Sequence, residues 1–187
     1  MPDEPEALGV LALMLLQDSR REARVDSDGE LVLLEEQDRS LWDRREIETG
    51  LGLLQRASRL GPPGPYALQA AIAAEHARSD GPAETDWARI ASLYRLLALA
   101  QPSPVIELNR AAAVAMAEGP ERGLELMDDP AVAGELTDYQ PFWSARADLL
   151  RRAGRPDEAA EAYARALALT TNPVERRFVE RRLAELT

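Results

Sequence analysis

Glycine and proline residues recur along this chain at nearly even intervals, and this spacing constrains the fold more than any other feature of the sequence. The glycines are Gly81, Gly119 and Gly154, in steps of 38 and 35 residues, and the prolines are Pro65, Pro104 and Pro141, in steps of 39 and 37. Both series lie close to the roughly 34-residue period of a tetratricopeptide-type helix pair. The sequence therefore predicts stacked helical repeats, an architecture that binds partners more often than it catalyses reactions.

The chemistry of the two residue types predicts where the helices begin and end. Glycine adopts the left-handed conformation that closes a helix, and proline fits the first turn of the next helix, where its missing N–H costs nothing. We expect each proline of the series to open the first helix of a pair and each glycine to end it. Pro82 is then expected to open a return helix that runs to Ala100.

The two ends of the chain are also predicted to be helical. Residues 4–20 place an apolar face inward, formed by Leu8, Leu11, Ala12, Leu15 and Leu16. Residues 22–37 break this rhythm, and a loop or small hairpin is expected around Asp28-Gly29. Helical spacing returns from Asp38, with Asp38 or Ser40 as its cap, and a final helix from Val174 is expected to close the stack with a polar face.

The predicted fold class is therefore all-α, with antiparallel helix pairs stacked as a tetratricopeptide-like right-handed solenoid and a short irregular or hairpin segment near 22–37. The stretch Gly61-Pro62-Pro63-Gly64-Pro65 is the clearest joint in the chain. We accordingly expect an N-terminal helical subdomain over 1–64. Residues 65–187 should form the repeats and the cap helix.

Composition narrows the possible partners. The 187 residues carry a net charge of −11, and a surface this acidic repels phosphate backbones, so direct nucleic-acid binding is not expected. The charge is uneven, because residues 143–187 hold nine arginines against seven acids while residues 1–142 hold thirteen against twenty-six. Cysteine is absent, which excludes disulfides and favours a cytoplasmic location. The apolar run Leu8 to Leu16 is far shorter than the roughly 20 residues that span a bilayer, so no membrane contact is expected.

Reactive constellations are missing from the sequence. His76 is the single histidine, so neither a histidine-based triad nor a histidine metal cluster can be assembled. The run from Asp26 to Gly29 resembles the start of a calcium loop, but its glycine is fourth instead of sixth, and a plain turn explains it better. We predict no catalytic residue, no cofactor and no metal site, and hence no enzyme.

Two polar segments are candidate partner contacts. One runs through Gln37, Asp38, Arg39 and Trp42, and the other is the pair Asn109-Arg110 inside an otherwise apolar helix. The alternative for each is structural, with helix capping in the first segment and a bond from Asn109 to a backbone carbonyl in the second. Both interpretations stay open at this point.

These segments also carry a family resemblance. The motifs are Pro5-Glu6-Ala7-Leu8-Gly9, the run Gly29 to Asp43 that reads GELVLLEEQDRSLWD, the run Gly64 to Ala74 that reads GPYALQAAIAA, and Leu108-Asn109-Arg110-Ala111. In this order they resemble the C-terminal helical extension of a subgroup of bacterial extracytoplasmic-function RNA polymerase sigma factors. The resemblance covers nearly the whole chain.

The resemblance implies a regulatory, protein-binding role in transcription initiation. In that family the regions that bind core polymerase and the promoter precede the extension, and none of them is visible here. Met1 would then be an introduced start on an excised domain. The implied partners are RNA polymerase, the sigma regions fused upstream in the native protein, or another protein.

Two other functions are weighed against this one. A free-standing adaptor of the tetratricopeptide type would bind a peptide in its concave groove, with Asn109 and Arg110 clamping an extended backbone or a carboxylate. An enzyme or small-molecule sensor would need a pocket, and the aromatic side chains available to line one are Trp42, Trp87 and Tyr94. Aromatic residues at helical spacing are more often part of a core.

Overall fold

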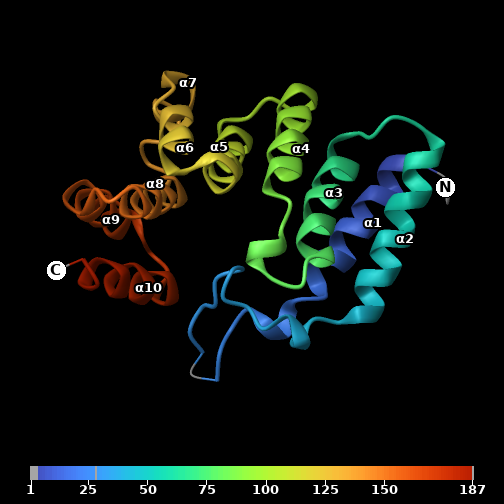
Figure 1. The fold of residues 1–187 in the computed structure, drawn as a ribbon, viewed down its shortest axis with the longest axis horizontal. Helices are drawn as coiled ribbons and strands as arrows, with labels where there is room; N and C mark the ends of the chain where they lie inside the picture. The colour runs from blue at the N-terminus through green and yellow to red at the C-terminus, as the bar shows by residue number, and fades with distance from the viewer. Residues whose placement is uncertain (1–3, 28, 187) are drawn as a thin grey trace. The chain divides into compact units, whose positions relative to one another are not determined.

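The computed structural model describes residues 4–27 and 29–186, and in these residues it is all-helical, without a named strand. Neighbouring helices pack as adjacent pairs, which confirms the predicted tetratricopeptide-like class (Figure 1). The chain forms two compact units, Met1–Pro102 and Ser103–Thr187, each with its own helices. These units do not coincide with the predicted division at residue 64, and that division stays a prediction about the organisation of the repeats.

Unit 1, Met1–Pro102, is built around α3. Its elements are α1 (Pro5–Asp18), η1 (Arg21–Ala23), η2 (Arg39–Leu41), α2 (Arg44–Leu60), α3 (Pro65–Arg78), η3 (Pro82–Glu84) and α4 (Trp87–Ala100). Helix α1 packs against both α2 and α3, and α4 packs against α3. Figure 1 shows α1, α2 and α3 side by side.

Close helix contact in unit 1 depends on small residues and one carboxylate. A Cβ built on Gly9 of α1 would lie 2.7 Å from the backbone nitrogen of Ala67, so only glycine permits this approach to α3. The carboxylate of Glu6 accepts hydrogen bonds from the backbone N–H groups of Tyr66 (3.0 Å) and Ala67 (3.2 Å). A side chain of α1 thus satisfies the exposed N–H groups at the start of α3 and complements its dipole.

The loop between α1 and α2 forms the expected small hairpin. An antiparallel bridge joins Val25 and Leu31, and the backbone N–H of Val32 donates to the carbonyl oxygen of Arg24 at 3.0 Å. Gly29 has a φ of 77°, in the left-handed region. Asp28, the other residue of the predicted turn, lies outside the described residues, as does Met1.

Unit 2, Ser103–Thr187, holds the repeats that the proline spacing predicts best. Its helices are α5 (Pro104–Glu118), α6 (Pro120–Met127), α7 (Pro130–Ala133), α8 (Gln140–Arg152), α9 (Pro156–Leu169) and α10 (Pro173–Ala184). Gly119 and Gly154 have φ values of 109° and 72° and stand where one helix gives way to the next. Both glycines therefore do what the sequence predicts of them.

The core of unit 2 is rich in alanine, as close helix packing requires. Ala159 and Ala166 of α9 are fully buried, and Tyr163 between them is 2% exposed. Val179 holds α10 on the same cluster, at 1% exposure. On α6, a Cβ built at Gly123 would lie 2.5 Å from the Cβ of Ala115, so α5 and α6 meet where neither has a large side chain.

Four local predictions are wrong. Helix α3 ends at Arg78 with Ser79 as its C-cap, and Gly81 does not have a positive φ, so it does not close the helix as expected. Helix α4 begins at Trp87 instead of Pro82, because Asp86 caps it by accepting from the N–H of Arg89 at 2.8 Å. Helix α2 begins after Asp43, whose carboxylate accepts from Arg45 and Glu46, whereas Asp38 caps only the short turn η2. Leu11, expected on the inward face, is 46% exposed.

Candidate functional site

The predicted contact segment Gln37 to Trp42 forms a turn that lies against the core of unit 1. The backbone N–H of Ser40 donates to Asp38 Oδ1 at 2.8 Å, and hydrogen bonding by Ser40 lowers the pKa of the Asp38 carboxyl. The Trp42 side chain is 4% exposed and belongs to the core cluster with Leu16 and Ile47. The segment is thus fixed in place by its own polar groups and by one buried indole.

Arg39 connects this turn to the end of α3. Its Nη1 lies 2.5 Å from the carbonyl oxygen of His76, 2.6 Å from that of Ser79 and 2.8 Å from the Ser79 hydroxyl. These oxygens belong to the last turn of α3 and its cap, where carbonyl groups lack helical partners. The guanidinium also stands over the ring of Trp42, 4.8 Å from its centroid. Burial lowers the pKa of Arg39, which nevertheless stays charged.

Two buried polar atoms near this turn have no hydrogen-bond partner within the described residues. They are Nε1 of Trp42 and Oε1 of Gln37. The amide nitrogen of Gln37 donates to the carbonyl oxygen of Val32 at 3.2 Å, which ties the residue to the hairpin. Buried polar atoms without a hydrogen-bond partner are uncommon in proteins, so part of the hydrogen-bonding capacity of this segment is unused.

His76 and Trp87 pack together beside Arg39. Their ring centroids are 5.2 Å apart, with the rings edge to face. Burial, followed by the charges of Arg20 and Arg39, lowers the pKa of His76 to about 4. The imidazole is therefore neutral near pH 7 and serves as a packing group at the α3–α4 junction.

The second predicted segment lies in unit 2 and is more open. Asn109 is exposed on α5, and its side chain makes no hydrogen bond with any described residue. The expected bond to a backbone carbonyl is thus not present. Arg110 pairs with Glu107, one turn earlier, with Nε and Oε2 2.6 Å apart. Because Asn109 and Arg110 belong to unit 2 and Gln37 to Trp42 belong to unit 1, the two segments are separate candidates.

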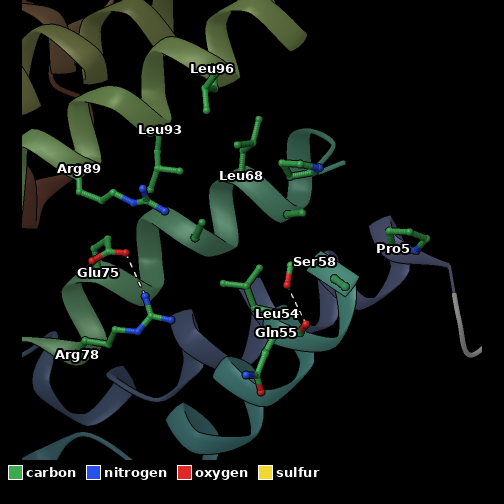
Figure 2. Close-up of a pocket in the computed structure, with 14 residues that line it drawn as sticks. Pro5, Leu54, Gln55, Ser58, Leu68, Glu75, Arg78, Arg89, Leu93 and Leu96 are labelled. Atoms are coloured by element: carbon green, nitrogen blue, oxygen red, sulfur yellow. Dashed lines mark hydrogen bonds and ion pairs between the residues drawn. The ribbon is translucent and has the colours of Figure 1, made fainter. Parts of the chain in front are cut away.

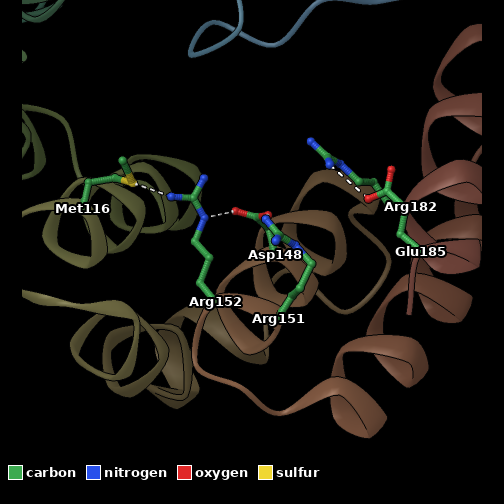
Figure 3. A network of polar contacts seen from close by, with 6 residues as sticks. All are labelled: Met116, Asp148, Arg151, Arg152, Arg182 and Glu185. Carbon is green, nitrogen blue, oxygen red and sulfur yellow. Dashed lines mark hydrogen bonds and ion pairs between the residues drawn. The ribbon is translucent and has the colours of Figure 1, made fainter. Parts of the chain in front are cut away.

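A polar network joins helices of unit 2 (Figure 3). Asp148 of α8 accepts from Arg151 at 2.7 Å and from Arg152 at 2.6 Å, and Arg152 also contacts the sulfur of Met116 on α5 at 3.1 Å. Hydrogen bonding to Asp148 raises the pKa of Arg151. Because its carboxylate is already shared by two guanidinium groups of the same helix, Asp148 is not an open binding group; the contact between helices is that of Arg152 with Met116.

Unit 1 also contains a groove that sequence reasoning missed (Figure 2). Its volume is about 390 Å³, and α2, α3 and α4 supply most of its walls. Leu54, Leu68, Leu93 and Leu96 give it an apolar lining, and charged groups stand at one end. The sequence signal that could have indicated it is leucine on α4, because Leu96 is not one of the helically spaced residues Trp87, Ile90, Tyr94 and Leu97.

The groove is not the aromatic pocket that a sensor or enzyme was expected to use. Trp42, Trp87 and Tyr94 do not line it. Burial raises the pKa of Tyr94, in keeping with a packed position. In the described part of the chain there is also no group of three potential metal-ligating side chains, and no helix is long and apolar enough to cross a membrane.

Comparisons with known proteins agree with the repeat architecture. A family of unknown function (DUF6596) matches residues 1–58, and the tetratricopeptide repeat matches residues 141–173. An uncharacterized protein of Rhizobium meliloti (strain 1021) is 46% identical over 185 residues, which cover 99% of this chain and 43% of that protein. The chain therefore spans less than half the length of this relative. No solved structure matches the present chain.

The tetratricopeptide match falls on one structural pair. Residues 141–173 contain nearly all of α8, the turn at Gly154 and all of α9. Repeats of this type stack into extended surfaces that bind other proteins. The coarse functional conclusion is thus a helical repeat protein with a role in protein interaction.

Proposed function

We propose that this chain is a regulatory interaction domain of an extracytoplasmic-function sigma factor. It would modulate transcription initiation by contacting RNA polymerase, the DNA-binding regions of the sigma factor or another protein. The observation that carries the proposal is the helical repeat stack, with its tetratricopeptide match at 141–173. The ordered motifs between Pro5 and Ala111 supply the link to sigma factors.

The charge of the chain supports this choice of partner. A net charge of −11 suits a basic protein surface, such as one that binds DNA, and suits nucleic acid itself poorly. The relative from Rhizobium meliloti is more than twice as long as the matched segment, so in that protein the domain is joined to other regions. We therefore expect the domain to contact either the sigma regions fused to it or the RNA polymerase that those regions bind.

The proposal can be tested by measuring whether the immobilised chain retains its proposed partners. The chain would be immobilised, and purified core polymerase and isolated sigma regions would be passed over it at low and moderate salt. We expect retention of at least one of them, with affinity that falls as salt rises, because the attraction is electrostatic. The proposal fails if neither is retained at either salt concentration.

A second candidate function is a free-standing peptide-binding adaptor, and Asn109 is the observation that favours it. Its side chain is exposed and makes no hydrogen bond with the residues that the structure describes, next to the partly exposed Arg110. An Asn109→Ala variant should bind an extended peptide more weakly under this function. If the chain instead binds polymerase or sigma regions through a different surface, the same substitution should leave their retention unchanged.

A further inference from the structure

The groove of unit 1 follows one face of α3. The residues of α3 that line it are Ala67, Leu68, Ala71, Glu75 and Arg78. From Leu68 onward the steps are three and four residues, which place these side chains in one stripe that at 1.5 Å per residue is about 15 Å long, with Ala67 beside Leu68. That length corresponds to roughly three turns of a second helix.

The floor and walls of this groove suit a helix. Ala71 presents only a methyl group to it, Ala57 and Ala67 lie buried at its base, and Figure 2 shows α2 and α4 on its two sides. Short side chains let helix axes approach to about 8–10 Å, the usual packing distance. Leu96 stands on the rim of the groove with 43% of its surface exposed, so an occupant would remove apolar area from water.

The charges at the groove end are uneven. Arg78 is paired with Glu75 at 3.0 Å. Arg89, the other arginine that lines the groove, is exposed, and its guanidinium has no acidic partner in the part of the chain that the structure describes. In a chain with a net charge of −11, this unpaired cation is a specific attraction for one carboxylate.

We propose that this groove docks an amphipathic α-helix of a partner protein, with its apolar face over Leu96 and a carboxylate side chain at Arg89. The inference rests on the proposed function as an interaction domain and names the partner's chemistry. The charged residues that line the groove are Glu75, Arg78 and Arg89, so the carboxylate of the docked helix meets a cationic end. A fatty acid or a second copy of this chain would meet the same apolar lining, and the test separates them.

The probe is a displayed library of helical peptides of about twelve residues, slightly longer than the groove. Each peptide has apolar residues at positions i, i+3, i+4 and i+7, and its remaining positions vary. Selection on the full chain should enrich peptides with an acidic residue at one end. Their dissociation constants would be measured by fluorescence polarisation.

Matched variants on α4 locate the site. Leu96→Glu and Arg89→Glu should each weaken binding about tenfold, by removing apolar burial and by reversing the charge. Leu99→Glu and Arg95→Glu are the controls, since both residues are exposed on the same helix and neither lines the groove. Circular dichroism checks that each variant is folded. If Leu96→Glu fails to fold, Ala71→Leu fills the groove without adding charge and should also weaken binding.

Several results would overturn the proposal. They are the absence of any enriched peptide, equal effects of groove and control variants, competition by dodecanoate alone, and self-association of the chain that Leu96→Glu abolishes. If groove variants lose peptide binding but still retain polymerase or sigma regions, the groove serves another partner and the proposed function stands. If nothing binds the groove while sigma regions are retained, only the groove inference fails.

Discussion

Arg39 ties the loop between α1 and α2 to the end of α3 by hydrogen bonds, beside the buried ring of Trp42. Three oxygen atoms lie within 2.8 Å of its Nη1, and the guanidinium plane stands over the ring of Trp42. These contacts give Arg39 a structural role, which accounts for its presence in the motif without any contact to a partner protein. Contact with a partner through Arg39 stays a prediction, as it does for Gln37, Asp38 and Trp42.

We expect Arg39→Lys to lower the free energy of unfolding by about 2 kcal/mol. Lysine keeps the charge but has no planar group to stand over Trp42, and its shorter side chain places the ammonium away from the three oxygens. Hydrogen bonds to charged groups contribute about 1.5–3 kcal/mol. Urea denaturation measures the change. Arg44→Lys, at an exposed position at the start of α2, is the control and should shift stability by less than about 0.5 kcal/mol. Equal effects of the two substitutions would refute the role assigned to Arg39.

His76 gives the fold a defined pH dependence. Its pKa is about 4 in the folded chain, against the ordinary value of 6.5, because burial and then Arg20 and Arg39 disfavour the charged form. Above pH 6.5 both folded and unfolded chains hold a neutral imidazole. Between pH 6.5 and 4 the unfolded chain takes up a proton that the folded chain does not, so stability falls as the pH falls.

The stability advantage of wild type over His76→Gln should therefore shrink by about 2 kcal/mol between pH 7.5 and pH 5. Taking the difference between the two proteins removes the contribution of the carboxyl groups that they share. Since the chain has one histidine, proton NMR of its imidazole also reports the pKa directly. A titration midpoint near 6.5 would contradict the buried position.

At the scale of the helices, packing in unit 2 depends on close contact between α5 and α6. A Cβ at Gly123 would lie 2.5 Å from the Cβ of Ala115 and 2.8 Å from the carbonyl oxygen of Ala111. We expect Gly123→Ala to destabilise the chain by about 1–3 kcal/mol, because the two helices must move apart. Thermal unfolding followed by circular dichroism measures this loss.

Gly52 provides the opposite case. It lies exposed within α2, with nothing within 4 Å of a built Cβ. Gly52→Ala should stabilise the chain by about 0.5–1 kcal/mol, because alanine has the higher helix propensity. If both substitutions changed stability in the same direction, close packing would not be what distinguishes the two sites.

The sequence predicted the ends of some helices correctly and missed others, and individual residues show why. Pro104 and Gly119 set the ends of α5, because proline and glycine restrict the backbone through their own covalent structure. The start of α4 was missed because Asp86 supplies a side-chain cap that outweighs the proline signal at Pro82. Capping depends on which of several polar residues reaches the free N–H groups, and periodicity carries no information about that.

The candidate sites were harder to predict than the helices. The motif around Arg39 was recognised, but its bonds to Ser79 span forty residues and follow from tertiary packing alone. The groove depends on how much of α3 is left uncovered by α2 and α4. No repeat pattern in one helix fixes that outcome.

At the scale of the molecule, the two units have separate cores. Leu16 belongs to the cluster of unit 1 and Leu150 to that of unit 2, and each is 2% exposed. No residue is shared between the two clusters of described residues. Repeat proteins of this kind owe their stability to neighbouring contacts rather than to one central core.

Leu16→Ala and Leu150→Ala should therefore weaken different parts of the chain. Each substitution removes the same buried atoms and costs about 2–5 kcal/mol within its own cluster. In hydrogen exchange, we expect Leu150→Ala to raise amide exchange mainly in α8 and α9, and Leu16→Ala to raise it mainly in α1 and α2, since local opening follows local contacts. Uniform loss of protection over α1 to α10 in both variants would mean that the chain unfolds as one cooperative body, and the separate cores would then have no energetic meaning.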